Sequence, residues 1–184
     1  QGTEAEPVTF TTSETVGRAG QWGGIKLEGT SVSGEFKHAV VEYSSYGIYF
    51  AGISNRTVKI EESVIRYNSD YGIRAGRNAS GNNNDNAKIS VTNSQIVDNF
   101  RHGIHAGNDD RGNWEIKGCS ILRNGEYGIY LGRSYKQVIE NNIINENKYG
   151  CELRYISHRS SATRIVMGNE ISKNKSWGLT CGDV

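Results

Sequence analysis

The sequence is poor in the features that mark membrane segments and nucleic-acid partners. No apolar run approaches the length that crosses a bilayer, and no basic amphipathic helix is present, so we expect no insertion into a membrane. Neither sign of charge dominates, with 21 basic against 20 acidic residues, and this balance predicts that nucleic acid is not a partner. The single proline, Pro7, stands where a strand would begin, and there its missing N–H does least harm.

Cysteine and histidine are too few and too irregularly spaced to predict a disulfide framework or a metal site. The three cysteines, Cys119, Cys151 and Cys181, are odd in number. Of the four histidines, only His102 and His105 are close in sequence, and on a regular strand these two would point to opposite faces. We therefore expect buried, unpaired thiols and no metal ligated by histidine.

What the sequence does contain is one phrase, Asn-x-x-Tyr-Gly-Ile, which returns about every 25 residues with a changed filling. It is clearest at residues 68–73 (NSDYGI) and recurs at 99–104 (NFRHGI) and 124–129 (NGEYGI). Self-similarity at this period predicts a repeat architecture. The glycines that anchor the copies are Gly24, Gly47, Gly72, Gly103, Gly128, Gly150 and Gly178.

Residues at fixed offsets from each glycine indicate which side chains point inward. Those one and three places after it are wholly apolar, as in Ile73 and Ala75, whereas the residue between them is mostly polar or aromatic and is expected to face outward. A column of asparagines precedes the glycines and is predicted to form a hydrogen-bonded ladder whose members also tolerate the left-handed conformation of a sharp corner. The column is Asn68, Asn99, Asn124, Asn147 and Asn174.

Each repeat is therefore predicted to form one turn of a parallel solenoid with about three short strands. No stretch has a sustained helical period, and an antiparallel sandwich is disfavoured because the only Asn-Gly dipeptide outside the long loops lies within the asparagine column. The prediction is an all-β, single-stranded parallel β-helix of about seven coils, in one domain over residues 1–184. No amphipathic helix caps either end, so we expect a segment of a longer solenoid or a unit that stacks end to end on other copies of itself.

The same register predicts the fate of two of the thiols. Cys151 and Cys181 fall in adjacent coils but two residues out of register, which places their Cα atoms roughly 8 Å apart. That separation exceeds the reach of a disulfide.

The chain resembles the right-handed parallel β-helix repeat proteins of the pectate-lyase-like superfamily, over nearly all of residues 2–182. Its opening at residues 7–11 and 22–25 is similar to the first coil of large secreted members, and the Asn-x-x-Tyr-Gly-Ile phrases are similar to their body. The resemblance implies a right-handed helix, an extracellular or cell-surface location and often a carbohydrate ligand. It does not choose among lyases, hydrolases, adhesins and scaffolds.

An enzyme of this family would need acidic side chains beside a groove. Asp70, the neighbours Asp109 and Asp110, and His102 superficially resemble polygalacturonase elements, but the histidine precedes the acidic pair and the final Arg-x-Lys element is absent. A lyase would need acidic ligands for calcium and a basic residue to abstract a proton, for which Asp109, Asp110 and Glu126 with Arg133 are the candidates. Asp-rich loops on solenoids are, however, usually solvated turns. A lyase or hydrolase acting on acidic polysaccharide is therefore the alternative function, and we expect no other cofactor.

The outward column is the main candidate binding surface. Its aromatic and charged side chains recur once per coil along a flat sheet, a spacing that suits stacking on sugar rings and pairing with uronate carboxylates. We predict a structural module that also contacts polysaccharide through Tyr49, Arg74, His105, Tyr130 and Glu152. A second aromatic column directly before the glycines is predicted to be a structural stack at a corner. Its members are Tyr46, Tyr71, His102, Tyr127, Tyr149 and Trp177.

Loops and sequons complete the candidate positions. Residues 77–88 and 108–113 follow the glycine-containing strand in adjacent repeats, so both loops are expected to leave the rod at one edge, with residues 155–163 at the equivalent place further on. Sequons at Asn55 and Asn78 lie in loops and are candidate glycosylation sites, whereas the sequon at Asn174 belongs to the inward column.

Overall fold

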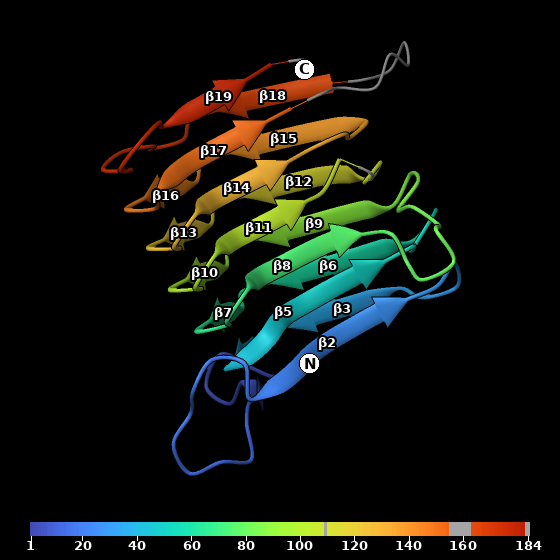
Figure 1. Ribbon diagram of the computed structural model, residues 1–184, viewed down its shortest axis with the longest axis vertical. Helices are drawn as coiled ribbons and strands as arrows, with labels where there is room; N and C mark the ends of the chain where they lie inside the picture. Colours follow the sequence, from blue (N-terminus) through green and yellow to red (C-terminus); the bar gives the residue numbers. More distant parts are fainter. Residues whose placement is uncertain (109, 155–162, 183–184) are drawn as a thin grey trace.

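The computed structural model describes residues 1–108, 110–154 and 163–182, and these form a parallel β-solenoid built from three sheets. Every strand pairing is parallel, because each coil adds one strand to each sheet before the chain moves on to the next coil (Figure 1). The described residues include no helix, and hence none long and apolar enough to cross a membrane. Strands β2 and β19 lie at opposite ends of the stack (Figure 1).

Within each coil the chain passes through sheet C, then sheet A and then sheet B. Sheet C contains β3 (Gly34–Lys37), β6 (Thr57–Glu61), β9 (Lys88–Thr92), β12 (Asn113–Lys117), β15 (Lys136–Glu140) and β18 (Thr163–Met167). Sheet A contains β1 (Val8–Phe10), β4 (Ala39–Glu42), β7 (Val64–Arg66), β10 (Gln95–Val97), β13 (Ser120–Leu122) and β16 (Ile143–Asn145). Sheet B contains β2 (Trp22–Glu28), β5 (Ser44–Ala51), β8 (Tyr71–Gly76), β11 (His102–Ala106), β14 (Tyr127–Leu131), β17 (Tyr149–Leu153) and β19 (Leu179–Cys181).

The predicted register of sheet B is confirmed. Ile73 pairs with Ile104 and Ile104 with Ile129, while Ala75 pairs with Ala106. These side chains are buried and meet the isoleucines and valines of the other two sheets in one continuous core. The alternation of apolar and polar residues therefore determines which face of each strand points to the core. The apolar side chains lie on the buried face and the polar ones on the face exposed to solvent.

The asparagine column forms the predicted ladder at the corner between sheets A and B. Asn68 donates to Asn99 at 2.9 Å, and Asn99 donates to Asn124 at 3.0 Å. The ladder continues through Asn147 to Asn174 at 3.0 and 3.2 Å. The sequence-based account of the corner was wrong in one respect. The left-handed conformation is adopted by the residue before each asparagine, because the asparagine itself is held by the ladder. These residues are Tyr67, Asp98, Arg123, Glu146 and Lys173, and Tyr43 has the same conformation before Ser44, whose hydroxyl donates to Asn68.

The invariant glycine of the phrase is explained by close approach between coils. A Cβ atom on Gly103 would lie 2.7 Å from the carbonyl oxygen of Gly128 and 2.9 Å from the amide nitrogen of Asn124. Any side chain would therefore push adjacent coils apart at the ladder.

A second, mixed ladder occupies the corner between sheets C and A. Ser63 N donates to Ser94 Oγ at 3.1 Å, and Asn142 donates to Asn169 at 2.9 Å. Cys119 lies between these pairs and its backbone N–H donates to Asn142 Oδ1 at 2.9 Å. This mixed ladder is not visible in the sequence, because its residue type changes from coil to coil although each member makes the same kind of hydrogen bond to the next coil.

The three cysteines are free. Cys151 pairs with Leu179 and Leu153 with Cys181, which confirms that Cys151 and Cys181 are two residues out of register. The expectation of buried thiols is confirmed for Cys119 and Cys151 but was wrong for Cys181, which is exposed because β19 lies at the end of its sheet and no further strand among the described residues covers it.

Candidate functional site

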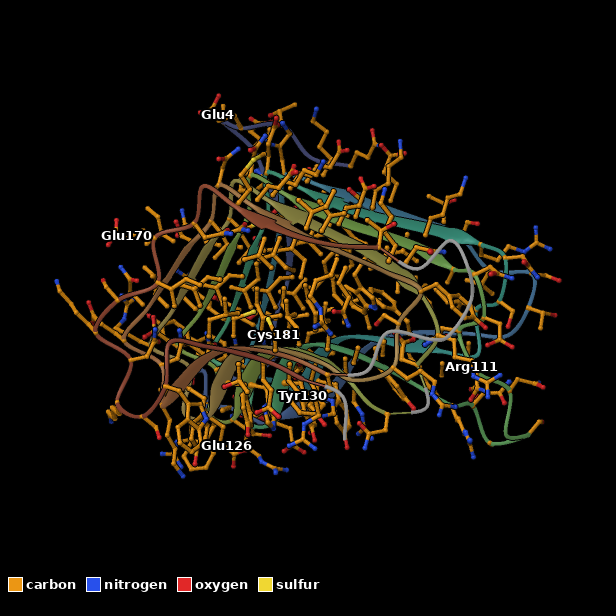
Figure 2. All side chains as sticks on the ribbon, turned by 90° about the horizontal axis from the view of Figure 1, so that it is seen from above. Glu4, Arg111, Glu126, Tyr130, Glu170 and Cys181 are labelled. Atoms are coloured by element: carbon orange, nitrogen blue, oxygen red, sulfur yellow. The ribbon has the colours of Figure 1, made fainter. Side chains whose placement is uncertain are left out.

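The outward column lies in register along sheet B, as predicted. Tyr49 pairs with Arg74, Arg74 with His105, and His105 with Tyr130, so the column crosses the middle of the sheet at one residue per strand. Tyr130 pairs in turn with Glu152. Viewed from above (Figure 2), Tyr130 and Glu126 project from the outer side of this sheet while Cys181 lies on its inner side.

The second aromatic column forms a continuous stack, which confirms its structural role. Ring centroids are 5.7 Å apart for Tyr46 and Tyr71, 5.0 Å for Tyr71 and His102, and 5.4 Å for His102 and Tyr127. The stack continues through Tyr149 to Trp177. Stacked rings at these separations stabilise the sheet beyond their buried area.

The two columns are not separate surfaces, and the expectation that His102 and His105 point to opposite faces was wrong. Their rings are 4.8 Å apart, and the rings of Tyr127 and Tyr130 are 5.3 Å apart. The pairing register does not change across Gly103, but His102, Gly103 and Ile104 are buried in succession, so strict alternation of inward and outward residues is lost at the glycine. We call the combined surface of both columns the tyrosine face.

Arg74 lies at the centre of the tyrosine face. Its Cζ atom is 5.2, 5.1 and 5.0 Å from the ring centroids of Tyr46, Tyr49 and Tyr71. The guanidinium lies over these three rings, which hold it by cation–π attraction. Within the described residues no carboxylate forms an ion pair with Arg74.

The other arginines beside this face are neutralised. Arg101 lies 3.3 Å from Asp70 and 3.3 Å from Glu126, and Arg154 is paired with Glu152. Glu152 is only 5% exposed, because Arg154 and the neighbouring rings cover it. Arg74 is therefore the arginine at the centre of this face that keeps its hydrogen-bond donors available for an anion.

The ring faces of the two predicted tyrosines are already covered. Arg74 and Lys26 lie 5.1 and 5.7 Å from the ring centroid of Tyr49. His105 stacks on Tyr130 at 4.8 Å with an interplanar angle of 9°. Arg154 lies on the same tyrosine at 5.6 Å. A sugar ring therefore has no open face to stack on at Tyr49 or Tyr130, and these side chains present edges and hydroxyl groups instead.

The two histidines of the face are neutral at neutral pH. Burial lowers the pKa of His102 to about 4, with Arg101 and Arg74 acting in the same direction, although its Nε2 lies 3.1 Å from Glu126. Burial, His102 and Arg74 lower the pKa of His105 to about 3. The Nδ1 atoms of both rings are buried and have no hydrogen-bond partner among the described residues.

The candidate catalytic acids are not brought together. Asp70 precedes β8 and contacts Arg101, whereas Asp110 follows β11 at the other end of the strands. Asp110 is fully buried and accepts hydrogen bonds from Trp114 Nε1 at 2.7 Å and Asn84 Nδ2 at 2.8 Å, and burial raises its pKa to about 6. It ties the loop after β8 to the loop after β11, which confirms that these loops leave at one edge. Asp109 lies outside the described residues.

The acids proposed for calcium do not fit a calcium site. The carboxylate of Asp110 is already engaged by Trp114 and Asn84, and Glu126 lies at the far edge of the sheet with Arg101 and His102. No group of three or more potential metal ligands occurs in the part of the chain that the structure describes. Calcium prefers several oxygen ligands with free lone pairs, and these residues do not supply them together.

The sequon asparagines differ in their surroundings. Asn55 is exposed and its side chain accepts a hydrogen bond from Asn86 at 3.3 Å. Asn78 is half-buried, and its Oδ1 accepts from the backbone of Ser80 and Asn82 inside its own loop. Most of the third predicted loop, residues 155–162, lies outside the described residues.

A groove that was not predicted from the sequence lies on the outer face of sheet C. It has a volume of about 490 Å³ and runs across β6, β9, β12 and β15. Lys136 pairs with Glu115 there, whereas Lys59 and Lys88 have no ion-pair partner among the described residues. Lysines at the outward positions of consecutive sheet C strands were the signal in the sequence.

Comparison with known proteins supports the fold and leaves the ligand open. The family model described as the right handed beta helix region matches residues 23–183. No curated protein and no solved structure matches the chain. Because the matched region covers most of the chain and the structure is a parallel solenoid, this protein belongs to the right-handed β-helix family.

Proposed function

We propose that this protein is an extracellular or cell-surface β-helix module that binds acidic polysaccharide on the tyrosine face, with Arg74 as its ionic contact. The observation that carries the proposal is the guanidinium held against Tyr46, Tyr49 and Tyr71 without a carboxylate partner among the described residues. A cation that is already oriented by rings loses little conformational freedom when it binds an anion. Uronate carboxylates have the charge and planar geometry that such a guanidinium recognises.

Replacing Arg74 with glutamine is expected to weaken binding to acidic polysaccharide by about ten- to one hundredfold. A hydrogen bond to a charged group contributes about 1.5–3 kcal/mol, and glutamine removes the charge while keeping a polar side chain of moderate length. Titration calorimetry with polygalacturonate, alginate and heparin at low and at physiological salt measures the change.

The matched control is Lys88→Gln, which removes the same charge from the groove on sheet C. It is expected to bind as the wild type does, and both variants are expected to keep the wild-type unfolding temperature because both positions are on the surface. If Lys88→Gln loses binding and Arg74→Gln does not, the site is on sheet C. If the wild type binds none of the three polymers, the proposed function is wrong.

A structural role is the second candidate, and the C-terminal coil favours it. Met167, Trp177 and Leu179 are 59%, 56% and 44% exposed, and β19 pairs with β17 alone. Such an apolar coil with an open strand edge fits a further parallel coil, supplied either within a longer solenoid or by a second copy of the chain. If a second copy supplies it, sedimentation velocity is expected to show association that grows with concentration and is abolished in Leu179→Lys. A monomer at all concentrations would refute end-to-end stacking.

A further inference from the structure

Phe100 is the most exposed of the large apolar side chains in the described chain, at 77%. It lies in the turn between β10 and β11, at the corner where sheet A meets the tyrosine face. A groove of about 660 Å³ runs beside it. Its lining includes Asp98, Phe100, Arg101, Gly125, Glu126 and Lys148.

Two departures from the repeat open this groove. Gly125 stands in the next coil at the position of Phe100, and a Cβ atom there would lie 1.9 Å from the carbonyl oxygen of Phe100. In the coil after that, the phrase is one residue shorter, running from Asn147 directly to Lys148 and Tyr149. The repeat therefore places no side chain over Phe100 from the following coil, and no aromatic ring among the described residues stacks on it. In this respect it differs from the tyrosines of the neighbouring face, whose rings are covered.

The charges around the groove favour an anion at one side of it. Lys148 is exposed, its ammonium group lies 5.2 Å from the ring centroid of Tyr149, and it has no carboxylate partner among the described residues. Arg101 is already neutralised by Asp70 and Glu126. Phe100 and Lys148 therefore line one groove as an open aromatic ring and an unneutralised cation. Such a combination suits a sugar that bears a carboxylate, since the aromatic ring takes the apolar face of the sugar and the cation takes its charge.

The groove is also close to Arg74. The guanidinium groups of Arg74 and Arg101 lie 5.0 and 5.7 Å from the centroid of the same ring, that of Tyr71. Arg101 belongs to both surfaces, because it lines the groove and covers this ring. A saccharide chain held by Arg74 therefore reaches the groove by crossing one tyrosine.

We infer that this corner groove is a second sugar subsite, in which the apolar face of a uronic acid unit stacks on Phe100 and its carboxylate pairs with Lys148. The inference rests on the proposed function, since this unit belongs to the same chain as the one bound by Arg74. The ligand is then an oligomer and not a single sugar, and its chain crosses the corner of the solenoid.

Galacturonate and mannuronate oligomers of increasing length, from monomer to hexamer, test the subsite by titration calorimetry on the full chain. The wild type is expected to bind longer oligomers more tightly than the monomer. Phe100→Ala is expected to lose about tenfold in affinity for the hexamer with no change for the monomer, because it removes the stacking surface only. Phe100→Tyr, which keeps the ring, is the matched control and is expected to bind as the wild type does.

The outcomes separate this subsite from the proposed function. If Arg74→Gln weakens binding of every oligomer while Phe100→Ala binds the hexamer as tightly as the wild type, the subsite is refuted and the proposed function stands. If the wild type binds no oligomer, both are refuted. Lys148→Gln is expected to reduce hexamer affinity by a similar factor and to make that affinity less sensitive to salt, and an unchanged salt dependence would remove Lys148 from the subsite.

Discussion

Replacing Asn124 with alanine is expected to destabilise the fold by about 4 kcal/mol or more. Its side chain is 1% exposed and makes four hydrogen bonds. It donates to Asn147 at 3.0 Å and to the carbonyl of Ile96 at 3.1 Å, and it accepts from the side-chain amide of Asn99 at 3.0 Å and from its backbone N–H at 3.2 Å.

The size of the effect follows from the groups that the substitution leaves behind. Four buried polar groups lose a partner at once. Asn147 Oδ1 keeps the backbone N–H of residue 124 and Asn99 Nδ2 keeps the carbonyl of Ile65, so the largest costs fall on the Asn99 backbone N–H and the Ile96 carbonyl, at about 1–3 kcal/mol for each unsatisfied group. Because a domain of this size is stable by only about 5–15 kcal/mol, much of the folded population is expected to be lost at physiological temperature. Urea unfolding followed by circular dichroism measures the change.

Asn174→Ala is the matched control, because it removes the same residue from the same ladder at its last position. Asn174 is half-buried, and water can replace its bonds to Asn147 and to the carbonyl of Ile144. We expect a loss of about 1–2 kcal/mol there. Equal losses at Asn124 and Asn174 would contradict the account, since they would mean that burial of the ladder contributes nothing.

The double variant His102→Tyr, His105→Tyr is expected to remain folded to a lower pH than the wild type. Burial in the folded protein lowers the pKa of His102 to about 4 and that of His105 to about 3, both below the ordinary histidine value of 6.5. A depressed histidine pKa contributes stability that is complete above the unfolded pKa and is lost as pH falls toward the folded pKa. The wild type should therefore lose several kcal/mol as pH falls from about 6.5 to about 3.

Tyrosine is the natural replacement at both positions. Tyr71 and Tyr127 stack on either side of His102, and Tyr130 follows His105 in the outward column. A tyrosine at each position therefore matches its neighbours in the two aromatic columns. Asp110 acts in the opposite sense, because its raised pKa of about 6 contributes stability at low pH that is lost as pH rises through that value. It is present in both proteins and cancels in the comparison.

Thermal unfolding across this pH window measures the effect of the histidines. The variant and the wild type should differ little in pH dependence above about pH 6.5, and the variant should unfold at higher temperature below it. Each single variant is expected to give part of the shift. An acid transition that is unchanged in the double variant would show that other groups control unfolding at low pH.

The sequence by itself determined the solenoid, the inward columns, the asparagine ladder and the offset of Cys151 from Cys181. In a stack of parallel coils each residue meets the equivalent residue of the next coil, so a residue type that recurs at the repeat spacing reports its own neighbours. The mixed ladder of Ser63, Ser94, Cys119 and Asn142 could not be predicted in this way, because its residue type changes from coil to coil while its role stays the same.

Only the tertiary structure decided how neighbouring columns combine. The loss of alternation at Gly103 leaves the ring of His102 against that of His105, and that contact joins a structural stack and a candidate binding column into one face. Burial of Asp110 by Trp114 and Asn84 likewise depends on two loops that meet across coils. Packing between coils determines where a side chain points at a bend and which group each charge pairs with. The spacing of residues along the chain predicts neither of these.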